Sequence, residues 1–545
     1  MMDTRPKILL FSHLCSSGFV TGAEKLLLLF ARQMASRYQC VLVVPCEGVL
    51  STKAREIGIP VIVFEIPLCV ALYTSNSQVK AQLENLKGQF VYQQLLALLV
   101  HERPQIVFSN TCVHPLPAVA AKSLGIPAVW SVMESIQPGP YRSQALDVIS
   151  EASDIIVGIS ETTLAPFRGH PGESKLHVLS PYVAADELDS PGWPAYRAML
   201  RQQYGWLDQH VVIGFIAGTI YRQKGLEAFV LAARQLYDPG RRLRFLAVGN
   251  SLDDAHMQTC RALVAESGLE GQFAWISFAE RIEHVYPAMD VVVVPSLQIE
   301  GFGMTALEGM YFGKPVVAFA SGGLAEIMMA TGNERFLART GHVEELADRM
   351  AQLANDDALR FDVGNRNAQA ARTVFGAESL LVQLDALRTR LPLVLPFLSP
   401  LIRGNRKTVY LVENGHRRPF VSVKALLQRG FRFEDVRQVT NRELRQIRRG
   451  APIAEWPLLR LRQVRTAAGK RRRLRRRRRY RLVTPDRLRS RRRIRVVLHR
   501  RSVRHRRRTG TARRRRPAVR SNRRLRRLTR ATGRSRLRIR QRKRK

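Results

Sequence analysis

The sequence contains few acidic residues and few cysteines. Its 545 residues include 44 Asp and Glu against 89 Lys and Arg, which gives a formal net charge of +45. No two cysteines form a Cys-x-x-Cys pair, and this favours free thiols in a reducing cytoplasm over a metal site or a disulfide framework. The cysteines are Cys15, Cys40, Cys46, Cys69, Cys112 and Cys260. Asp-x-Asp pairs and His/Cys clusters are also missing, so the sequence predicts no bound metal.

Long apolar runs are missing as well. The longest candidate, Leu391 to Ile402, is shorter than the roughly 18 residues of a membrane span and contains three prolines. Near the N-terminus, Lys7 to Phe11 is too short for the apolar region of a signal peptide and predicts a first strand instead. We therefore expect a cytoplasmic protein.

The positive charge is concentrated at one end of the chain. Residues 470–545 hold 40 Lys and Arg and one acid, Asp486, so everything before them carries only about +6. Residues 465–545 are Arg-rich, which predicts a disordered tail. Arginine pairs with phosphate, so the expected partners are polyanions: nucleic acid, an anionic membrane surface, or an anionic envelope or spore-surface polymer. Tyr480 is the one aromatic residue there, which favours backbone binding over base stacking. The alternative is an extension without a partner.

Strands alternate with helices over most of the chain, which predicts α/β domains with parallel sheets. The expected organisation is a first domain, a second domain, a linker, a small module and the tail, at residues 1–185, 186–385, 386–404, 405–460 and 461–545. In the first domain, strands are predicted at Lys7–Phe11, Cys40–Val44, Val61–Phe64, Ile106–Ser109, Ala128–Val132 and Ile155–Ile159. Helices are predicted at Ala23–Met34, Phe90–His101 and Ala118–Leu124, and residues 70–90 stay unassigned.

The second domain has the same alternation. Strands are predicted at Val211–Ala217, at Leu243–Gly249, from Phe273, and at Val291–Val294 and Pro315–Phe319, with helices at Gly303–Phe312, Val343–Leu353 and Ala358–Phe375. In the module, residues 408–413 and 418–421 flank Asn414-Gly415, a hairpin signal. We expect an α+β interaction module without a catalytic site.

The stretch with the most functional signals is residues 290–327. Glu300 is predicted to lie in a loop there, and Glu308, eight residues later, in a helix. Gly301 and Gly303 allow close approach of the backbone to a ligand. The amides of Gly303, Met304 and Thr305 would be free donors at the helix N-terminus, where phosphate binds well. Carboxylates on both sides of such a site suit a ligand with a central diphosphate and a polyol at each end, as in a nucleotide-sugar.

The run E-G-F-G-M-T-A-L-E-G-M-Y-F-G-K-P-V-V-A, followed by G-G-L-A-E-I, resembles the donor-site signature of the family 4 glycosyltransferases. That resemblance implies retaining enzymes of the GT-B fold, with two doubly wound Rossmann-like domains facing a cleft. It also implies a nucleotide-diphospho-sugar as co-substrate, with no metal or other cofactor. Glu300 would hold the sugar hydroxyls and Glu308 the ribose diol. The alternative is an ordinary Rossmann-like helix with surface acids.

Further segments match the same family. Gly218 to Gly225, G-T-I-Y-R-Q-K-G, resembles its G-R-L-x-x-x-K-G loop, which makes Lys224 the counter-charge of the diphosphate. Thr219 stands at the family's arginine position, and Arg222 could replace that charge. Gly22-Ala23-Glu24 resembles the family's G-G-x-E element, although Glu24 is equally well explained as a helix cap. Ser160-Glu161 matches a Ser-Glu pair that follows a strand.

One departure concerns Val129 to Glu134. Many relatives carry a histidine before the acid, near the sugar and the acceptor, and here Met133 holds that place. Methionine accepts no proton. Either Glu134 or the leaving phosphate takes the acceptor's proton, or the alignment is off by one residue, or activity is impaired.

The sequence therefore predicts a retaining glycosyltransferase acting on a glycan, lipid-linked or protein acceptor in cell-envelope, spore-surface or polysaccharide glycosylation. Its candidate catalytic residues are Glu300, Lys224 and Glu134. Its candidate donor-binding residues are Gly22, Gly218, Arg222, Lys224, Glu300, Gly301, Phe302, Gly303, Met304, Thr305 and Glu308. The resemblance also implies that the last helix crosses back onto the first domain. The alternatives are an inactive GT-B scaffold and a polyanion-binding protein that acts through its tail.

Overall fold

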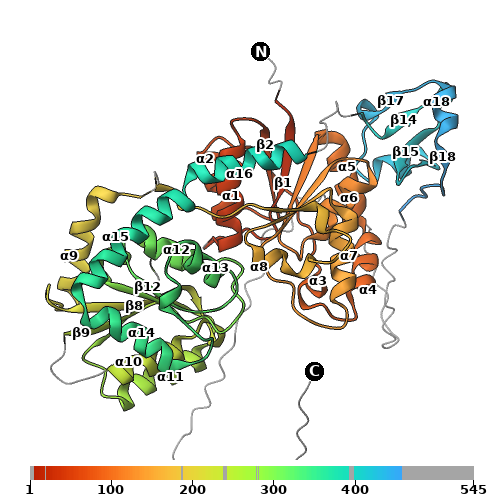
Figure 1. Cartoon of the computed structure of the whole chain (residues 1–545). Helices are drawn as coiled ribbons and strands as arrows, with labels where there is room; N and C mark the ends of the chain where they lie inside the picture. Colours follow the sequence, from red (N-terminus) through yellow and green to blue (C-terminus); the bar gives the residue numbers. More distant parts are fainter. Residues whose placement is uncertain are drawn as a thin grey trace, which may run out of the picture. The chain divides into compact units, whose positions relative to one another are not determined.

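The computed structural model describes residues 5–18, 20–185, 188–236, 242–277, 279, 281–391 and 398–456 (Figure 1). These residues form three sheets: a seven-stranded sheet, a six-stranded sheet and a small five-stranded sheet. The Arg-rich tail predicted to be disordered lies outside the described residues. None of the helices in the described ranges is both long enough and apolar enough to cross a membrane.

The first sheet is parallel throughout, with strand order β3-β2-β1-β4-β5-β6-β7. The chain winds outward from β1 in both directions, which confirms the predicted doubly wound α/β domain. Its strands are β1 (Lys7–Phe11), β2 (Gln39–Val44), β3 (Val61–Val63), β4 (Ile106–Asn110), β5 (Ala128–Val132), β6 (Ile155–Gly158) and β7 (Leu176–Val178). Most of these strand residues are buried because both faces of the sheet are covered.

The connections of the first domain are helical. The helices are α1 (Gly22–Met34), α2 (Val49–Glu56), α3 (Val70–Thr74), α4 (Val79–Lys87), α5 (Phe90–Glu102), α6 (Pro115–Ser123), α7 (Arg142–Ala152) and α8 (Glu161–Leu164). Residues 70–90, which the sequence left unassigned, form α3 and α4. Val79, Leu83 and Leu86 recur at helical spacing on α4 and are buried.

The second sheet is also parallel and has the order β10-β9-β8-β11-β12-β13. Its strands are β8 (Val211–Ile220), β9 (Leu243–Ser251), β10 (Phe273–Ile276), β11 (Val291–Val294), β12 (Val316–Phe319) and β13 (Leu337–Ala338). Its helices are α9 (Trp193–Gln203), α10 (Leu226–Leu236), α11 (Asp254–Glu266), α12 (Met304–Tyr311), α13 (Gly323–Ala330), α14 (Val343–Asn355) and α15 (Asp357–Val374). The second doubly wound domain is thereby confirmed.

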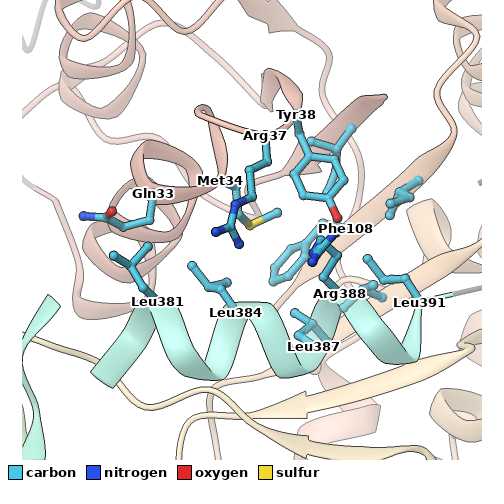
Figure 2. A pocket seen from close by; sticks show the side chains of 13 residues that line it. Gln33, Met34, Arg37, Tyr38, Phe108, Leu381, Leu384, Leu387, Arg388 and Leu391 are labelled. Atoms are coloured by element: carbon cyan, nitrogen blue, oxygen red, sulfur yellow. The ribbon is translucent and has the colours of Figure 1, made fainter. Parts of the chain in front are cut away.

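A further helix, α16 (Ala377–Arg390), packs on the first domain. Leu384, Leu387 and Leu391 face Met34 and Phe108 across an apolar seam (Figure 2). The side chain of Gln383 accepts a hydrogen bond from the amide of Ser180 (2.7 Å), and Asp385 pairs with Arg37. The crossing helix implied by the resemblance is thus α16, which the sequence analysis did not identify. It starts after Gly376, where a side chain would collide with the Arg372 carbonyl.

The small module is an α+β unit with sheet order β17-β14-β15-β16-β18. It contains β14 (Leu401–Arg403), β15 (Val409–Glu413), β16 (His416–Pro419), α17 (Val423–Leu427), β17 (Arg437–Gln438), α18 (Asn441–Gln446) and β18 (Arg448–Arg449). The predicted hairpin is confirmed, because β15 and β16 pair antiparallel around Asn414 and Gly415, both with positive φ. The module's buried residues join one core cluster with those of the first domain.

Two regular elements extend into residues 386–404, the predicted linker. α16 continues to Arg390, because Leu387 and Leu391 contact the first domain. β14 begins at Leu401, because its apolar residues pair with β15. The six cysteines form no disulfide with one another in this structure.

Candidate functional site

The loop before α12 is held by glycines at close contacts. Gly303 caps α12 with φ +119°, a conformation that other residues rarely adopt. A side chain at Gly301 would come within 2.4 Å of the Met133 carbonyl oxygen, so this loop lies directly against the first domain. The carbonyl of Glu300 accepts a hydrogen bond from the amide of Gly323 (2.8 Å), which ties the loop to α13. The motif glycines therefore fix where Glu300 stands.

The carboxylate of Glu300 has two partners. Lys224 Nζ lies 2.7 Å from its Oε1, and Ser296 Oγ donates to the same oxygen at 2.6 Å. Lys224 ends the short helix η5 (Arg222–Lys224), and Gly225 follows with φ +80° against the carbonyl of Pro295. The two loops that the sequence predicted to carry the donor site are thus in contact. Ser296 carries no motif signal, and the sequence analysis missed it.

Glu308, by contrast, has a partner on each of its two oxygens. Lys25 Nζ, from α1 of the first domain, lies 2.9 Å from Oε1, and the hydroxyl of Tyr286 donates to Oε2 at 3.1 Å. Tyr286 is fully buried, and its burial, followed by the charge of Glu308, raises its pKa well above its ordinary value. Tyr286 therefore remains a hydrogen-bond donor. Neither Lys25 nor Tyr286 was identified from the sequence, because their contacts to Glu308 depend on tertiary structure.

The N-terminus of α12 presents donors between the two glutamates. Within the described residues, the amides of Gly303, Met304 and Thr305 have no acceptor, whereas Ala306 and Leu307 already donate to the Gly303 carbonyl. Free amides at a helix N-terminus, together with the helix dipole, favour a phosphate group there. The predicted phosphate site is therefore available in this geometry.

Four other predicted donor residues have surroundings that the structure describes. The ring of Phe302 is buried against Phe375, so only its backbone remains to face a ligand. Arg222 is largely exposed and pairs with Glu227 (3.4 Å), so the replacement of the family's arginine charge by Arg222 stays a prediction. Gly22 and Gly218 are open positions, with nothing near an added side chain.

Met133 and Glu134 follow β5 of the first domain. The Met133 side chain is buried in the core, while its carbonyl approaches Gly301. Glu134 Oε2 accepts a hydrogen bond from the amide of Cys112 (3.2 Å). Burial raises the pKa of Glu134, and this hydrogen bond lowers it in part. The catalytic role of Glu134 stays a prediction.

Three buried polar atoms at the same edge of the first sheet have no partner within the described residues: Glu24 Oε1, Asn110 Oδ1 and Ser131 Oγ. Asn110 and Ser131 are register neighbours on β4 and β5, and the Asn110 amide donates to the Ala23 carbonyl (3.1 Å). Glu24 caps α1 through its other oxygen, which accepts from the amide of Thr21 (2.8 Å). Unpartnered buried polar atoms are rare in folded proteins and mark places that call for an explanation.

The matched Ser160-Glu161 pair joins the two domains. Ser160 Oγ donates to the Gly301 carbonyl (2.5 Å), and the carboxylate of Glu326 accepts from the amides of Glu161 (2.9 Å) and Thr162 (2.5 Å). A carboxylate at the start of α8 is favourable because the first amides of a helix lack partners. Glu326 belongs to the G-G-L-A-E-I segment, so this segment contributes to domain contact.

Among the described residues, no three His, Cys, Asp or Glu are grouped to hold a metal.

Residues 198–370 match the family model described as Glycosyl transferases group 1. A D-inositol 3-phosphate glycosyltransferase of Corynebacterium aurimucosum is 30% identical over 224 residues, which are 39% of this chain and 52% of the relative. A 2-deoxystreptamine glucosyltransferase of Streptomyces kanamyceticus is 36% identical over 178 residues, which are 32% of this chain and 44% of the relative. The chain thus spans about half the length of these relatives.

Solved structures resemble the whole two-domain part. HepE from Anabaena, in complex with UDP and glucose, superposes with a TM-score of 0.57 at 22% identity, covering 71% of this chain and all of HepE. Sucrose-phosphate synthase from Thermosynechococcus elongatus gives 0.55 at 17% identity, covering 71% of this chain and 99% of the synthase. At such identity the likeness concerns the fold. Together these matches confirm the resemblance drawn from the sequence, that of a bacterial GT-B glycosyltransferase.

Proposed function

We propose that this GT-B glycosyltransferase chain is a retaining enzyme that moves a sugar from a nucleotide-diphospho-sugar to a hydroxyl acceptor. The observation that carries the proposal is the arrangement at the start of α12. Free backbone amides lie between two carboxylates, Glu300 and Glu308, and Lys224 contacts the first of them. These groups match a diphosphate flanked by two polyols.

In this proposal Lys224 and the α12 amides hold the diphosphate and stabilise the charge that develops as it leaves. Electrostatic stabilisation by fixed donors is commonly the largest catalytic term. Glu300 accepts hydrogen bonds from the sugar hydroxyls, and Glu308 accepts them from the ribose diol. The nucleotide-sugar is a co-substrate, and no resident cofactor is required.

The acceptor oxygen attacks the anomeric carbon on the face from which the diphosphate leaves, so configuration is retained. The acceptor's proton passes either to the leaving diphosphate or to Glu134. A raised pKa makes Glu134 a better base than an ordinary carboxylate. A Glu134→Gln variant separates the two routes, because it slows turnover only if Glu134 takes the proton.

The proposed acceptor is a polyhydroxylated compound. The relatives are named for D-inositol 3-phosphate and for 2-deoxystreptamine, both six-membered carbon rings bearing hydroxyls. The unpartnered atoms of Glu24, Asn110 and Ser131 are able to hydrogen-bond to hydroxyls, and Ser131 stands two residues before Met133, whose carbonyl approaches Gly301. Glycan, lipid-linked and protein acceptors of envelope, spore-surface or polysaccharide glycosylation are the further classes to assay.

The test is a panel of nucleotide-sugars on the full chain, read as nucleoside diphosphate release with and without cyclic polyols. Glu300→Gln keeps the side chain's size but removes its charge, and Glu344→Gln on the exposed start of α14 is the matched control. We expect one donor to turn over, Glu300→Gln to lose at least tenfold in kcat/KM, and the control to match the parent. Equal turnover by Glu300→Gln would refute the donor-site assignment.

The second candidate is an inactive GT-B scaffold, and it is favoured by Met133 and Thr219 at positions where relatives carry a histidine and an arginine. A scaffold of this kind would bind a nucleoside diphosphate in calorimetry yet release none from any donor. Binding without turnover across the panel would therefore favour the scaffold.

A further inference from the structure

The small module carries a row of exposed cations along α18. Two follow β14 in the loop to β15, two lie on α18 and two form β18, as labelled in Figure 1. We call these residues the α18 stripe: Arg406, Lys407, Arg442, Arg445, Arg448 and Arg449. All six are exposed.

These segments are neighbours in the fold. The amide of Asn405 donates to the side chain of Asn441 (3.3 Å), so α18 starts at the loop that carries the first two cations. β18 follows α18 directly and pairs parallel with β16. The loop with the first two cations thus lies at the start of α18, and the strand with the last two follows its end.

No acid of the described residues forms an ion pair with the stripe, although Glu443 lies on α18 itself. The module, residues 398–456, contains thirteen Lys and Arg and five acids, and each acid is engaged elsewhere. Four pair with other cations, in Glu413–Arg418, Glu434–Arg432, Asp435–Arg103 and Glu455–Lys424. The fifth, Glu443, caps α18 by accepting from the amide of Thr440 (2.7 Å). Within the described residues no stripe cation has an ion pair.

Some exposed arginines elsewhere have carboxylate partners, as in Arg242–Asp357 and Arg339–Glu345, whereas the stripe gathers six cations without one. Six like charges on a short path repel one another, and an anion bound along them would relieve that repulsion. The stripe is therefore suited to an anionic partner with repeated charges.

We propose that the α18 stripe binds the phosphates of a linear phosphodiester polymer. Five of its six residues are arginine, whose planar fork pairs with phosphate through two parallel hydrogen bonds. No exposed large apolar side chain lies on the stripe; those of the module are Leu398, Val421, Val423, Leu427 and Phe433. The stripe thus lacks both the apolar anchor of a bilayer-binding surface and the aromatic platform that stacks bases. Recognition is of the polymer backbone and independent of sequence.

The test separates the stripe from the Arg-rich tail by ending the chain after Arg460. Residues 1–460 form one compact unit that contains all three sheets and both core clusters, so every contact described above is kept. The probe is a short mixed-sequence DNA duplex, followed by fluorescence anisotropy over a series of KCl concentrations.

One variant changes Arg406, Arg442, Arg445 and Arg449 to Gln. Its matched control changes four exposed cations that have no ion pair within the described residues: Lys53, Lys80, Arg234 and Arg366. Each phosphate contact contributes about 0.9 to the slope of log binding constant against log salt. We expect the slope of the stripe variant to be smaller in magnitude by roughly 3.6 and the control to keep the parent's slope.

Three results would overturn the proposal: an unchanged slope in the stripe variant, an equal loss in the control, or binding to phosphatidylglycerol vesicles but not to DNA. The last would assign the stripe to an anionic bilayer. Thermal unfolding of both variants checks the fold. If the fourfold variant is less stable, the Arg442→Gln, Arg445→Gln double variant replaces it, with an expected slope loss of roughly two.

Discussion

Lys25 pairs with Glu308, the carboxylate that is proposed to receive the ribose diol of the nucleotide. Glu308 is proposed to receive the ribose diol, yet Lys25 and Tyr286 occupy its two oxygens. Tyr286 is buried and stays bonded, so Lys25 is the partner to be displaced. We therefore expect Lys25→Met, which keeps the length of the side chain but removes its charge, to bind nucleoside diphosphate more tightly than the parent.

The structure sets the size of this effect. The Lys25 side chain is 42% exposed and that of Glu308 12%, so solvent screens much of the 2.9 Å attraction. Pairs of this kind contribute about 0.2–1 kcal/mol, which corresponds to a Kd lower by a factor of about 1.4 to 5. Titration calorimetry with nucleoside diphosphates measures it. The matched control is Lys53→Met, an exposed lysine on α2 without an ion pair in the described residues.

The difference in Kd between Lys25→Met and the parent should also depend on salt. High salt screens the Lys25–Glu308 pair in the parent, so the advantage of Lys25→Met should shrink as KCl rises. A Kd that increases in Lys25→Met would refute the argument. That result would mean that Lys25 contacts the phosphates of the bound nucleotide rather than competing for Glu308.

Two further predictions concern the domain contact and pH. Glu326→Ala removes a carboxylate that accepts hydrogen bonds from the amides of Glu161 and Thr162, and each hydrogen bond to a charged group is worth about 1.5–3 kcal/mol. We therefore expect a lower Tm and a higher KM for the donor. An unchanged Tm and KM would contradict a role of Glu326 in holding the two domains together. Burial lowers the pKa of His13 to about 4, so His13 stabilises the fold fully above pH ~6.5 and loses this contribution as pH falls towards 4. Between these pH values, the free energy of unfolding measured in urea titrations should therefore fall more for the parent than for His13→Gln, by at most roughly 3 kcal/mol. An equal fall in both proteins would show that His13 does not titrate in that range.

Local patterns in the sequence were sufficient for most strands and for the donor loops. Buried strands such as β11 are short β-branched runs between turn residues, and their position follows from those runs alone. The glycines of the loop before α12 also indicated its conformation, because few other residues tolerate a positive φ or a close approach of the backbone. The predictions that Lys224 and Glu300 share a site rested on motif spacing, and the 2.7 Å contact places them together.

Contacts between distant segments left no such pattern. Lys25 meets Glu308 across 283 positions, and Glu326 reaches the start of α8 across 164. Periodicity within one helix says nothing about which helix stands opposite, so only the folded chain reveals these pairs. The same limit explains α16, whose moderately apolar face becomes recognisable only against the first domain. The motifs therefore predict where a donor binds, whereas the contacts around that place, such as that of Lys25 with Glu308, are specified by the packing of one domain against the other.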